Sequence, residues 1–128
     1  MTQPSAAPIN ARPVNSAEGG TTALTQSDFE RALADHNTVL VDFWAPWCGP
    51  CRGFAPIFEA AAKEHPDILF GKVNVDEHTE LARHYGVRAI PTLVVFRDGN
   101  PVHTQAGALT ASALNQLIDG VAPPLPCE

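Results

Sequence analysis

The sequence predicts an α/β domain in which a mixed central β-sheet is flanked by helices on both faces. Strand-like apolar runs alternate with helix-like segments in the order βαβαβαββα, if a short strand at 23–24 is counted. Strand–helix–strand units of this kind favour parallel strands joined by right-handed crossovers. The turn sequence Asp98-Gly99-Asn100 stands between two strand-like runs and predicts a hairpin that adds an antiparallel strand.

The first half of the domain contains the strand that we expect at the centre of the sheet. Ser27 can cap a helix over residues 28–34. The run 38–44 is almost continuously apolar and rich in β-branched and aromatic residues, which is typical of a strand covered on both faces. A helix is expected from about residue 48 to 64, interrupted in its pattern by Pro56.

The second half is expected to supply the remaining strands and two helices. Asp76 can cap a short helix that ends at Gly86. Thr110 can cap a last amphipathic helix whose apolar side carries Leu114, Leu117 and Ile118. The expected strands are residues 68–75, 92–96 and 101–105.

Segments with few large apolar residues flank this domain. Residues 1–22 are rich in small and polar residues, and residues 122–128 contain three prolines. We therefore expect a flexible tail at each end and a folded domain over 23–121. Cys127, near the C-terminus, is expected to be a free thiol, with an intermolecular disulfide or a regulatory role as alternatives.

Composition and charge exclude several classes of function. The 128 residues are 45% hydrophobic and 17% charged, which fits one globular domain. Eight Lys and Arg against 14 Asp and Glu give a net charge of −6, which opposes binding to nucleic acid or to anionic membrane surfaces. No secretory-signal pattern and no apolar run of about 20 residues is present, so we expect a cytoplasmic protein, and a monomer.

Two cysteines three residues apart are the strongest functional signal. Cys48 and Cys51 stand where a strand ends and a helix begins. Residues at i and i+3 of a helix have Cβ atoms about 5–6 Å apart, close to the 3.5–4.5 Å of a disulfide, so the pair can alternate between dithiol and disulfide. The helix N-terminus favours a thiolate at Cys48, the expected nucleophile, and Cys51, expected to be more buried, resolves the mixed disulfide.

A structural zinc site is the alternative interpretation of this pair. Four-coordinate zinc needs two more Cys or His ligands, and the sequence has no second Cys-x-x-Cys. His78 and His84 are six residues apart on a predicted helix and should point in different directions. We therefore expect no bound metal.

The sequence around the cysteines resembles the thioredoxin family. The resemblance covers about residues 23–121, and its Trp-Ala-Pro-Trp form is most similar to the bacterial thioredoxin-2 branch. That branch usually has an N-terminal zinc module with two further Cys-x-x-Cys pairs, which we do not expect here because residues 1–22 contain no cysteine. The motifs that carry the resemblance are 41–52 (VDFWAPWCGPCR), 55–56, 72–76, 85–92, 96–99 and 107–108.

The resemblance implies roles for further residues. Asp42 would take the proton of the resolving cysteine, with its pKa raised within an apolar strand and tuned by Lys72. From the residues alone, a solvent-facing Asp42 and a solvated Lys72 remain alternatives. Pro91 would be a cis-proline facing the cysteines, with a strand-opening proline as the alternative. The implied substrate-binding surface consists of Trp47, Gly49, Pro50, Ile90, Pro91, Gly107 and Ala108.

These features predict a protein-disulfide reductase that contributes to redox homeostasis. The resemblance implies that it holds no bound cofactor, that Cys48–Cys51 is its redox-active disulfide, and that electrons come from NADPH through a flavin-dependent thioredoxin reductase. Its other partners would be disulfide-containing protein substrates. The Gly49-Pro50 dipeptide is similar to reducing members of the family, which opposes an oxidase or isomerase. A binding module that does not need its thiols is the remaining alternative, opposed by the retention of both cysteines.

Overall fold

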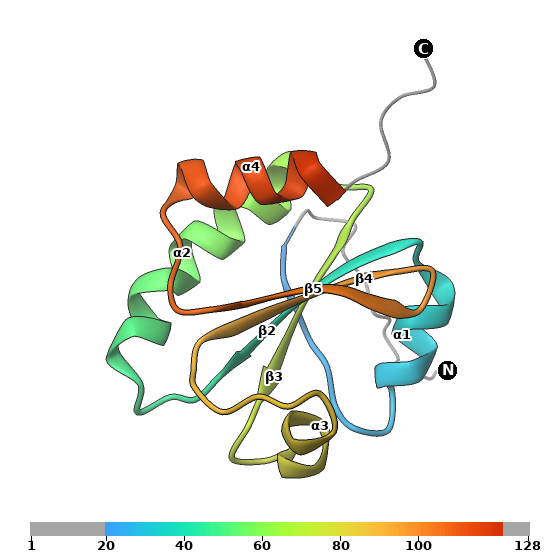
Figure 1. The fold of residues 1–128 in the computed structure, drawn as a ribbon, viewed down its shortest axis with the longest axis vertical. Coiled ribbons are helices and arrows are strands. Elements are labelled where there is room, and N and C mark those ends of the chain that lie inside the picture. The colour runs from blue at the N-terminus through green and yellow to red at the C-terminus, as the bar shows by residue number, and fades with distance from the viewer. Residues whose placement is uncertain (1–19, 122–128) are drawn as a thin grey trace, which may run out of the picture.

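The computed structural model describes residues 20–121, which form a five-stranded sheet and four helices (Figure 1). The strands lie in the order β1-β3-β2-β4-β5. The elements are β1 (Thr22–Ala23), α1 (Phe29–Asp35), β2 (Thr38–Trp44), α2 (Gly49–Glu64), β3 (Leu69–Asn74), α3 (Thr79–His84), β4 (Thr92–Arg97), β5 (Asn100–Ala106) and α4 (Ala111–Val121).

The mixed α/β sheet expected from the sequence is confirmed, with two differences in detail. The first strand begins at Thr22, a residue that the sequence analysis assigned to the N-terminal tail. The rest of that tail up to residue 19, and the tail expected at 122–128, lie outside the described residues. Beyond the hairpin, β4 is also antiparallel to its neighbour β2, although the strand–helix–strand pattern favoured a parallel strand.

The direction of β4 follows from the length of α3. A parallel crossover must carry the chain back along the whole strand, usually with a helix of comparable length. Helix α3 has six residues and spans only about 9 Å. The chain therefore re-enters the sheet near the end at which β3 finished, and β4 runs in the opposite direction.

Alternation along β2 divides the core into two layers. One face of the sheet packs against α1 and α3 and includes Val39, Val41 and Phe43 from β2. The opposite face packs against α2 and α4 and includes Leu40, together with Phe58 of α2 (Figure 1). Because successive side chains of a strand point to opposite faces, Asp42 lies on the same face as Leu40, under α2 and α4.

Two helix starts differ from those predicted. Ser27 does not cap α1; instead the Thr25 N–H donates to Asp28 Oδ1 at 2.7 Å and the Asp28 N–H donates to Thr25 Oγ1 at 3.3 Å. This reciprocal pair forms the turn before the helix, as a capping box does. Helix α3 begins at Thr79 rather than after Asp76. The cap predicted for α4 is confirmed, since the Ala113 N–H donates to Thr110 Oγ1 at 3.1 Å.

The two edges of the sheet are short or irregular. Strand β1 has two residues, and β5 contains Pro101 and pairs with β4 through a register shift at Val95/Phe96. Nearly all side chains of β5 are exposed. None of the described helices has the length and apolar character needed to cross a membrane.

Candidate active site

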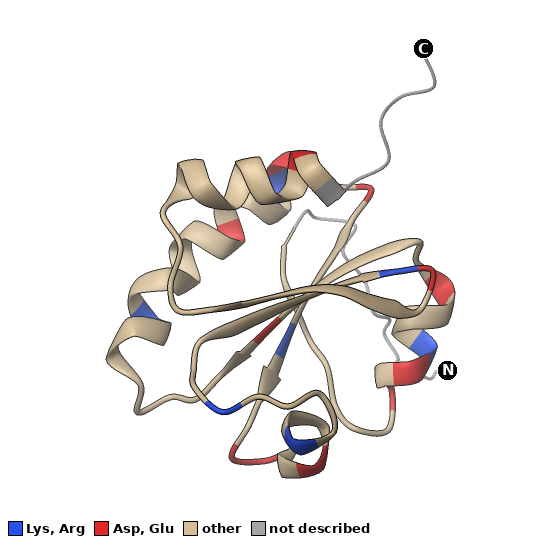
Figure 2. Ribbon diagram, viewed as in Figure 1, with Lys and Arg blue, Asp and Glu red and all other residues tan. Residues whose placement is uncertain are grey.

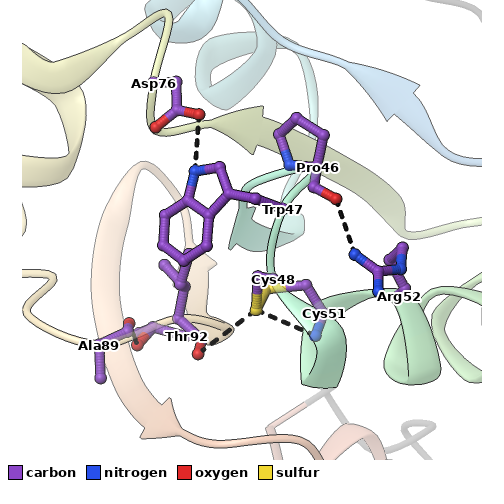
Figure 3. Close-up of a disulfide and its surroundings, with 9 residues drawn as sticks. Pro46, Trp47, Cys48, Cys51, Arg52, Asp76, Ala89 and Thr92 are labelled. Atoms are coloured by element: carbon purple, nitrogen blue, oxygen red, sulfur yellow. Dashed lines mark hydrogen bonds between the residues drawn. A yellow bond between two sulfur atoms is a disulfide. The ribbon is translucent and has the colours of Figure 1, made fainter.

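The candidate site lies at the carboxyl end of the central strand. Strand β2 ends at Trp44, residues 45–47 follow, and Cys48 is the N-cap of α2 (Figure 3). Pro50 stands within the first helical turn, where the missing N–H of proline costs no helix hydrogen bond. The buried strand therefore fixes the position of the helix N-terminus, and with it the position of the first cysteine.

Cys48 and Cys51 form a disulfide. Their Cα atoms are 5.2 Å apart, and the Cys51 N–H donates to Cys48 Sγ at 3.1 Å. Both residues are buried, Cys48 with 5% and Cys51 with 2% of its surface exposed. Cys51 is the more buried of the two, as expected. A thiolate at Cys48 would sit where the helix offers an N–H and the positive end of its dipole.

Asp42 and Lys72 are neighbours in the sheet. The parallel register of β2 and β3 pairs Asp42 with Lys72. Figure 2 shows acidic and basic colouring next to one another on these two strands. Asp42 is fully buried, so the solvent-facing alternative is excluded. Neither of its carboxyl oxygens has a hydrogen-bond partner among the described residues. Burial raises the pKa of Asp42 from 3.8 to about 7, and the charge of Lys72 opposes that rise.

An apolar groove lies beside the disulfide. Its volume is about 390 Å³, and its lining includes Trp47, Val75, Val87, Arg88, Ala89 and Ile90. Trp47 is 67% exposed, which is unusual for so large an apolar side chain. Cys48 Sγ lies 3.8 Å from the carbonyl oxygen of Ile90, a residue of the lining, so the groove lies next to this sulfur. An extended chain could therefore lie along Trp47 and Ile90 with its own sulfur at Cys48.

The loop before β4 forms one side of this groove. The Ile90–Pro91 peptide is cis, as the resemblance implied, and Pro91 is buried. The Gly107 N–H donates to the Pro91 carbonyl oxygen at 2.8 Å, and Gly107 has a φ of +93°, a conformation open to glycine at little cost. The structure thus joins Ile90, Pro91 and Gly107 beside Cys48, with exposed Ala108 following in the chain.

Two further residues hold the active-site loop, and the sequence analysis assigned neither this role. Asp76 Oδ2 accepts a hydrogen bond from Trp47 Nε1 at 2.9 Å, and Arg52 donates to the Pro46 carbonyl oxygen at 2.9 Å (Figure 3). Asp76 had been expected to cap α3. The position of Arg52 was a local signal for such a contact. A cation in the first turn of a helix is unfavourable to the helix dipole, so its presence there suggests an interaction outside the helix. No local pattern links Asp76 to a residue 29 positions away.

The zinc alternative finds no donor set in the described part of the chain. No group of three or more His, Cys, Asp or Glu side chains converges between residues 20 and 121. His78 lies 3.8 Å from Glu77, and the ring of His84 packs edge-on against Tyr85 at 4.6 Å. The two histidines thus have different neighbours.

Comparisons with known proteins agree on one family. A family model described as Thioredoxin matches residues 20–120. The chain is 45% identical over 98 residues to a protein of Streptomyces coelicolor described as "Putative thioredoxin 2", covering 77% of this chain and 73% of that protein. It is 43% identical over 99 residues to "Thioredoxin 1" of Synechococcus elongatus, covering 76% of this chain and 92% of that one.

Solved structures give the same result. A mutant thioredoxin from Halobacterium salinarum NRC-1 superposes with a TM-score of 0.79 at 37% identity, covering 84% of this chain and 96% of that one. A chain from a study titled "Structural basis of the thiol resolving mechanism in yeast mitochondrial 1-Cys peroxiredoxin via glutathione/thioredoxin systems" superposes with a TM-score of 0.73 at 31% identity, covering 79% and 95%.

Proposed function

The chain belongs to the thioredoxin family of thiol–disulfide oxidoreductases, and we propose that it reduces protein disulfides with Cys48 as the nucleophile and Cys51 as the resolving thiol. The observation that carries these roles is the placement of the two sulfurs. Cys48 caps α2, and its Sγ accepts a hydrogen bond from the Cys51 N–H, whereas Cys51 lies inside the first turn of the helix. A negative charge is thus better stabilised at residue 48 than at residue 51.

The exchange proceeds in two displacements. The Cys48 thiolate attacks one sulfur of a substrate disulfide, a mixed disulfide forms, and the first substrate thiolate leaves. The Cys51 thiol then loses its proton and attacks Cys48 Sγ, which releases the second substrate thiolate. Two electrons pass to the substrate, and the pair returns to the disulfide seen in the structure. The dithiol and the disulfide would both form at the N-terminus of α2 with little change in backbone conformation.

Asp42 is proposed as the acceptor of the Cys51 proton. It lies on the face of the sheet that α2 covers, it is fully buried, and no hydrogen bond within residues 20–121 engages its carboxyl group. A pKa of about 7 supports this role, because a base works best when its pKa lies near the working pH. Lys72, its partner in the register, would tune that pKa.

The substrate is proposed to lie across the apolar surface at the cysteines. Trp47 and Ile90 line the groove, and Gly49 and Pro50 are exposed at the start of α2. Gly107, which is bonded to Pro91 next to Ile90, would extend this surface together with exposed Ala108. An apolar groove with few polar groups accepts extended chains of many sequences. Broad specificity for protein disulfides follows from this surface.

The route of electrons to Cys48–Cys51 remains part of the proposal. A thioredoxin that donates electrons must be re-reduced, and a flavin-dependent thioredoxin reductase with NADPH is the expected donor. Such turnover needs a compartment that keeps thiols reduced, for which we propose the cytoplasm. The net charge of −6 supports protein substrates rather than nucleic acid or anionic membranes. We also propose that the protein acts as a monomer without resident metal.

A covalent trap tests the assignment of the two cysteines. The reduced Cys51→Ser variant, mixed with insulin as a disulfide substrate, should accumulate an adduct that dithiothreitol cleaves. The matched Cys48→Ser variant should form none, although it retains the Cys51 thiol; both variants also carry Cys127→Ser, so that the third cysteine of the chain cannot form the adduct. Adducts of equal yield at both cysteines would refute the assignment. NADPH oxidation by a bacterial thioredoxin reductase in the presence of the unmodified protein and insulin tests the electron route separately.

A further inference from the structure

Trp44 is placed where it contacts both the cysteines and Lys72. It is half-buried and packs against the cluster of Ala45, Cys48 and Cys51. The Lys72 ammonium lies 4.7 Å from the centroid of the same indole. At that distance a cation is attracted by the face of a tryptophan ring, which is the strongest of the aromatic partners. One side chain thus connects the redox pair with the lysine that neighbours Asp42.

The sheet register gives the Lys72 ammonium two possible partners. Residues 42 and 44 lie on one face of β2 because side chains alternate along a strand. Lys72 is the register partner of Asp42, so its long side chain begins beside Asp42 and extends along the strand to the indole. The ammonium lies over the indole, and neither carboxyl oxygen of Asp42 receives a hydrogen bond from any described residue. A direct ion pair, which would hold the carboxyl group ionised, is therefore absent between these residues.

We propose that Trp44 is a positioning residue whose indole face holds the Lys72 ammonium away from Asp42, so that the buried carboxyl group has a nearby positive charge but no ion pair. This inference rests on the proposed role of Asp42 as proton acceptor. The arrangement leaves Asp42 free to take and release a proton in each cycle. A lysine that closed onto the carboxylate would stabilise the charged form and weaken it as a base.

The other charged groups near Lys72 are few. Lys72 and Trp44 share a groove of about 450 Å³ with Asn74, Glu77 and His78, and the edge residues of β1 and its loop that line it are uncharged. Glu77 lies 3.8 Å from His78. On the side of β4, the register partner of Asp42 is the apolar Leu93. Lys72 is the charge that acts on Asp42, and Glu77 and His78 are the other ionisable residues of this groove.

A double-mutant cycle with a site-specific titration tests the proposal. Trp44→Phe keeps an aromatic ring but weakens its attraction for a cation, and Lys72→Met removes the cation while keeping an apolar side chain. The pKa of Asp42 is measured in the oxidised protein from the ¹³C resonance of its own carboxyl group, assigned with Asp42→Asn. The carbon resonances of the His78 ring lie in a different spectral region and do not overlap with the carboxyl signal of Asp42.

The expected result is a downward shift of the Asp42 midpoint by roughly half a pH unit in Trp44→Phe, because the released ammonium moves toward the carboxylate. The same substitution in the Lys72→Met background should leave the midpoint unchanged. No shift, an upward shift, or an equal shift in both backgrounds would overturn the proposal, the last because it would show an effect of packing or hydration alone.

Insulin reduction is measured for the wild type, Trp44→Phe, Lys72→Met and the double variant. This assay distinguishes a failure of the Trp44 proposal from a failure of the proposed function. If the wild-type chain did not reduce insulin, the proposed function would fail whatever the titration gave. If all four proteins reduced insulin and the midpoint did not depend on Trp44 through Lys72, only the role of Trp44 would fail. A thermal melt of each variant checks that the fold is retained.

Discussion

Trp47 and Asp76 are joined by a hydrogen bond of 2.9 Å from the indole Nε1 to the carboxylate Oδ2. The bond fixes an indole that is otherwise two-thirds exposed, immediately before Cys48 in the chain. Asp76 is held in turn, since its N–H donates to Asn74 Oδ1 at 2.9 Å. The loop after β3 thereby orients one wall of the groove beside the disulfide.

Removal of this bond should slow the reaction with protein substrates. We expect Asp76→Ala to lower kcat/KM for insulin by about 3- to 10-fold, since an exposed hydrogen bond of this kind is worth about 1 kcal/mol. The matched control is Asp76→Asn, which retains an acceptor for the indole. The redox potential of the pair should change little in either variant. Equal losses in both variants, or none in Asp76→Ala, would contradict an orienting role.

Asp42 should make the stability of the protein depend on pH. Its folded-state pKa is about 7 against an ordinary 3.8, so between these values the folded protein holds a proton that the unfolded chain has lost. The stabilising contribution is complete below about pH 4 and is lost as the pH rises through about 7. Asp42→Asn should therefore gain stability relative to the wild type over this range, by at most about 4 kcal/mol.

Urea unfolding of the oxidised protein at several pH values measures this difference. Asp67→Asn is the matched control, because the side chain of Asp67 is exposed and its replacement should leave the pH dependence unaltered. A difference between Asp42→Asn and the wild type that stayed constant from pH 4 to pH 8 would show that burial does not raise the pKa of Asp42.

Cys48 should react with alkylating agents below the pH at which ordinary thiols do. Its sulfur caps α2 and accepts the Cys51 N–H, and both features favour the thiolate. In the reduced Cys51→Ser variant, which keeps the backbone N–H, the rate of alkylation by iodoacetamide should have a midpoint within about pH 3.5–7.5, the general range for cysteines at such positions. A midpoint near that of free cysteine, about 8.5, would contradict the proposed nucleophile.

Gly53 offers a stability test that does not involve the chemistry. It lies in the interior of α2, is exposed, and a Cβ built there meets no atom within 4 Å. Gly53→Ala should raise the free energy of unfolding by about 1 kcal/mol, because alanine has the higher helix propensity. Gly71→Ala is the contrast: its Cβ would run into Leu24, which is itself buried, so this variant should be less stable. Denaturant melts that ranked the two variants in the opposite order would contradict this account.

Local patterns predicted most of the scaffold. The apolar run of residues 38–44 corresponds to β2, the predicted helix after it to α2, and the Asp98-Gly99 turn to the hairpin between β4 and β5. These elements follow from periodicity and turn chemistry, which act over a few residues. The cysteine pair was predictable for the same reason, since a spacing of three residues at a helix start already determines that two sulfurs can meet.

The parts that the sequence did not predict depend on distant contacts. Asp76 looked like a helix cap, but its carboxylate accepts a hydrogen bond from the Trp47 indole, which the tertiary fold brings close. The Asp76 N–H donates to Asn74 Oδ1, and α3 begins only at Thr79. The direction of β4 depended on the short length of α3. Sequence patterns do not define the ends of a helix accurately enough to predict that length. The Thr25–Asp28 pair was the exception, because its spacing is a local signal that could have been recognised.

The irregular sheet edges have a consequence for contacts with other polypeptides. An unpaired strand presents free N–H and C=O groups to which any extended polypeptide can add as a further strand. Here one border has only Thr22 and Ala23, and the other combines Pro101, which lacks an N–H, with the bulge at Val95/Phe96. Extended polypeptides thus find little template for strand addition at either border of the sheet within residues 20–121.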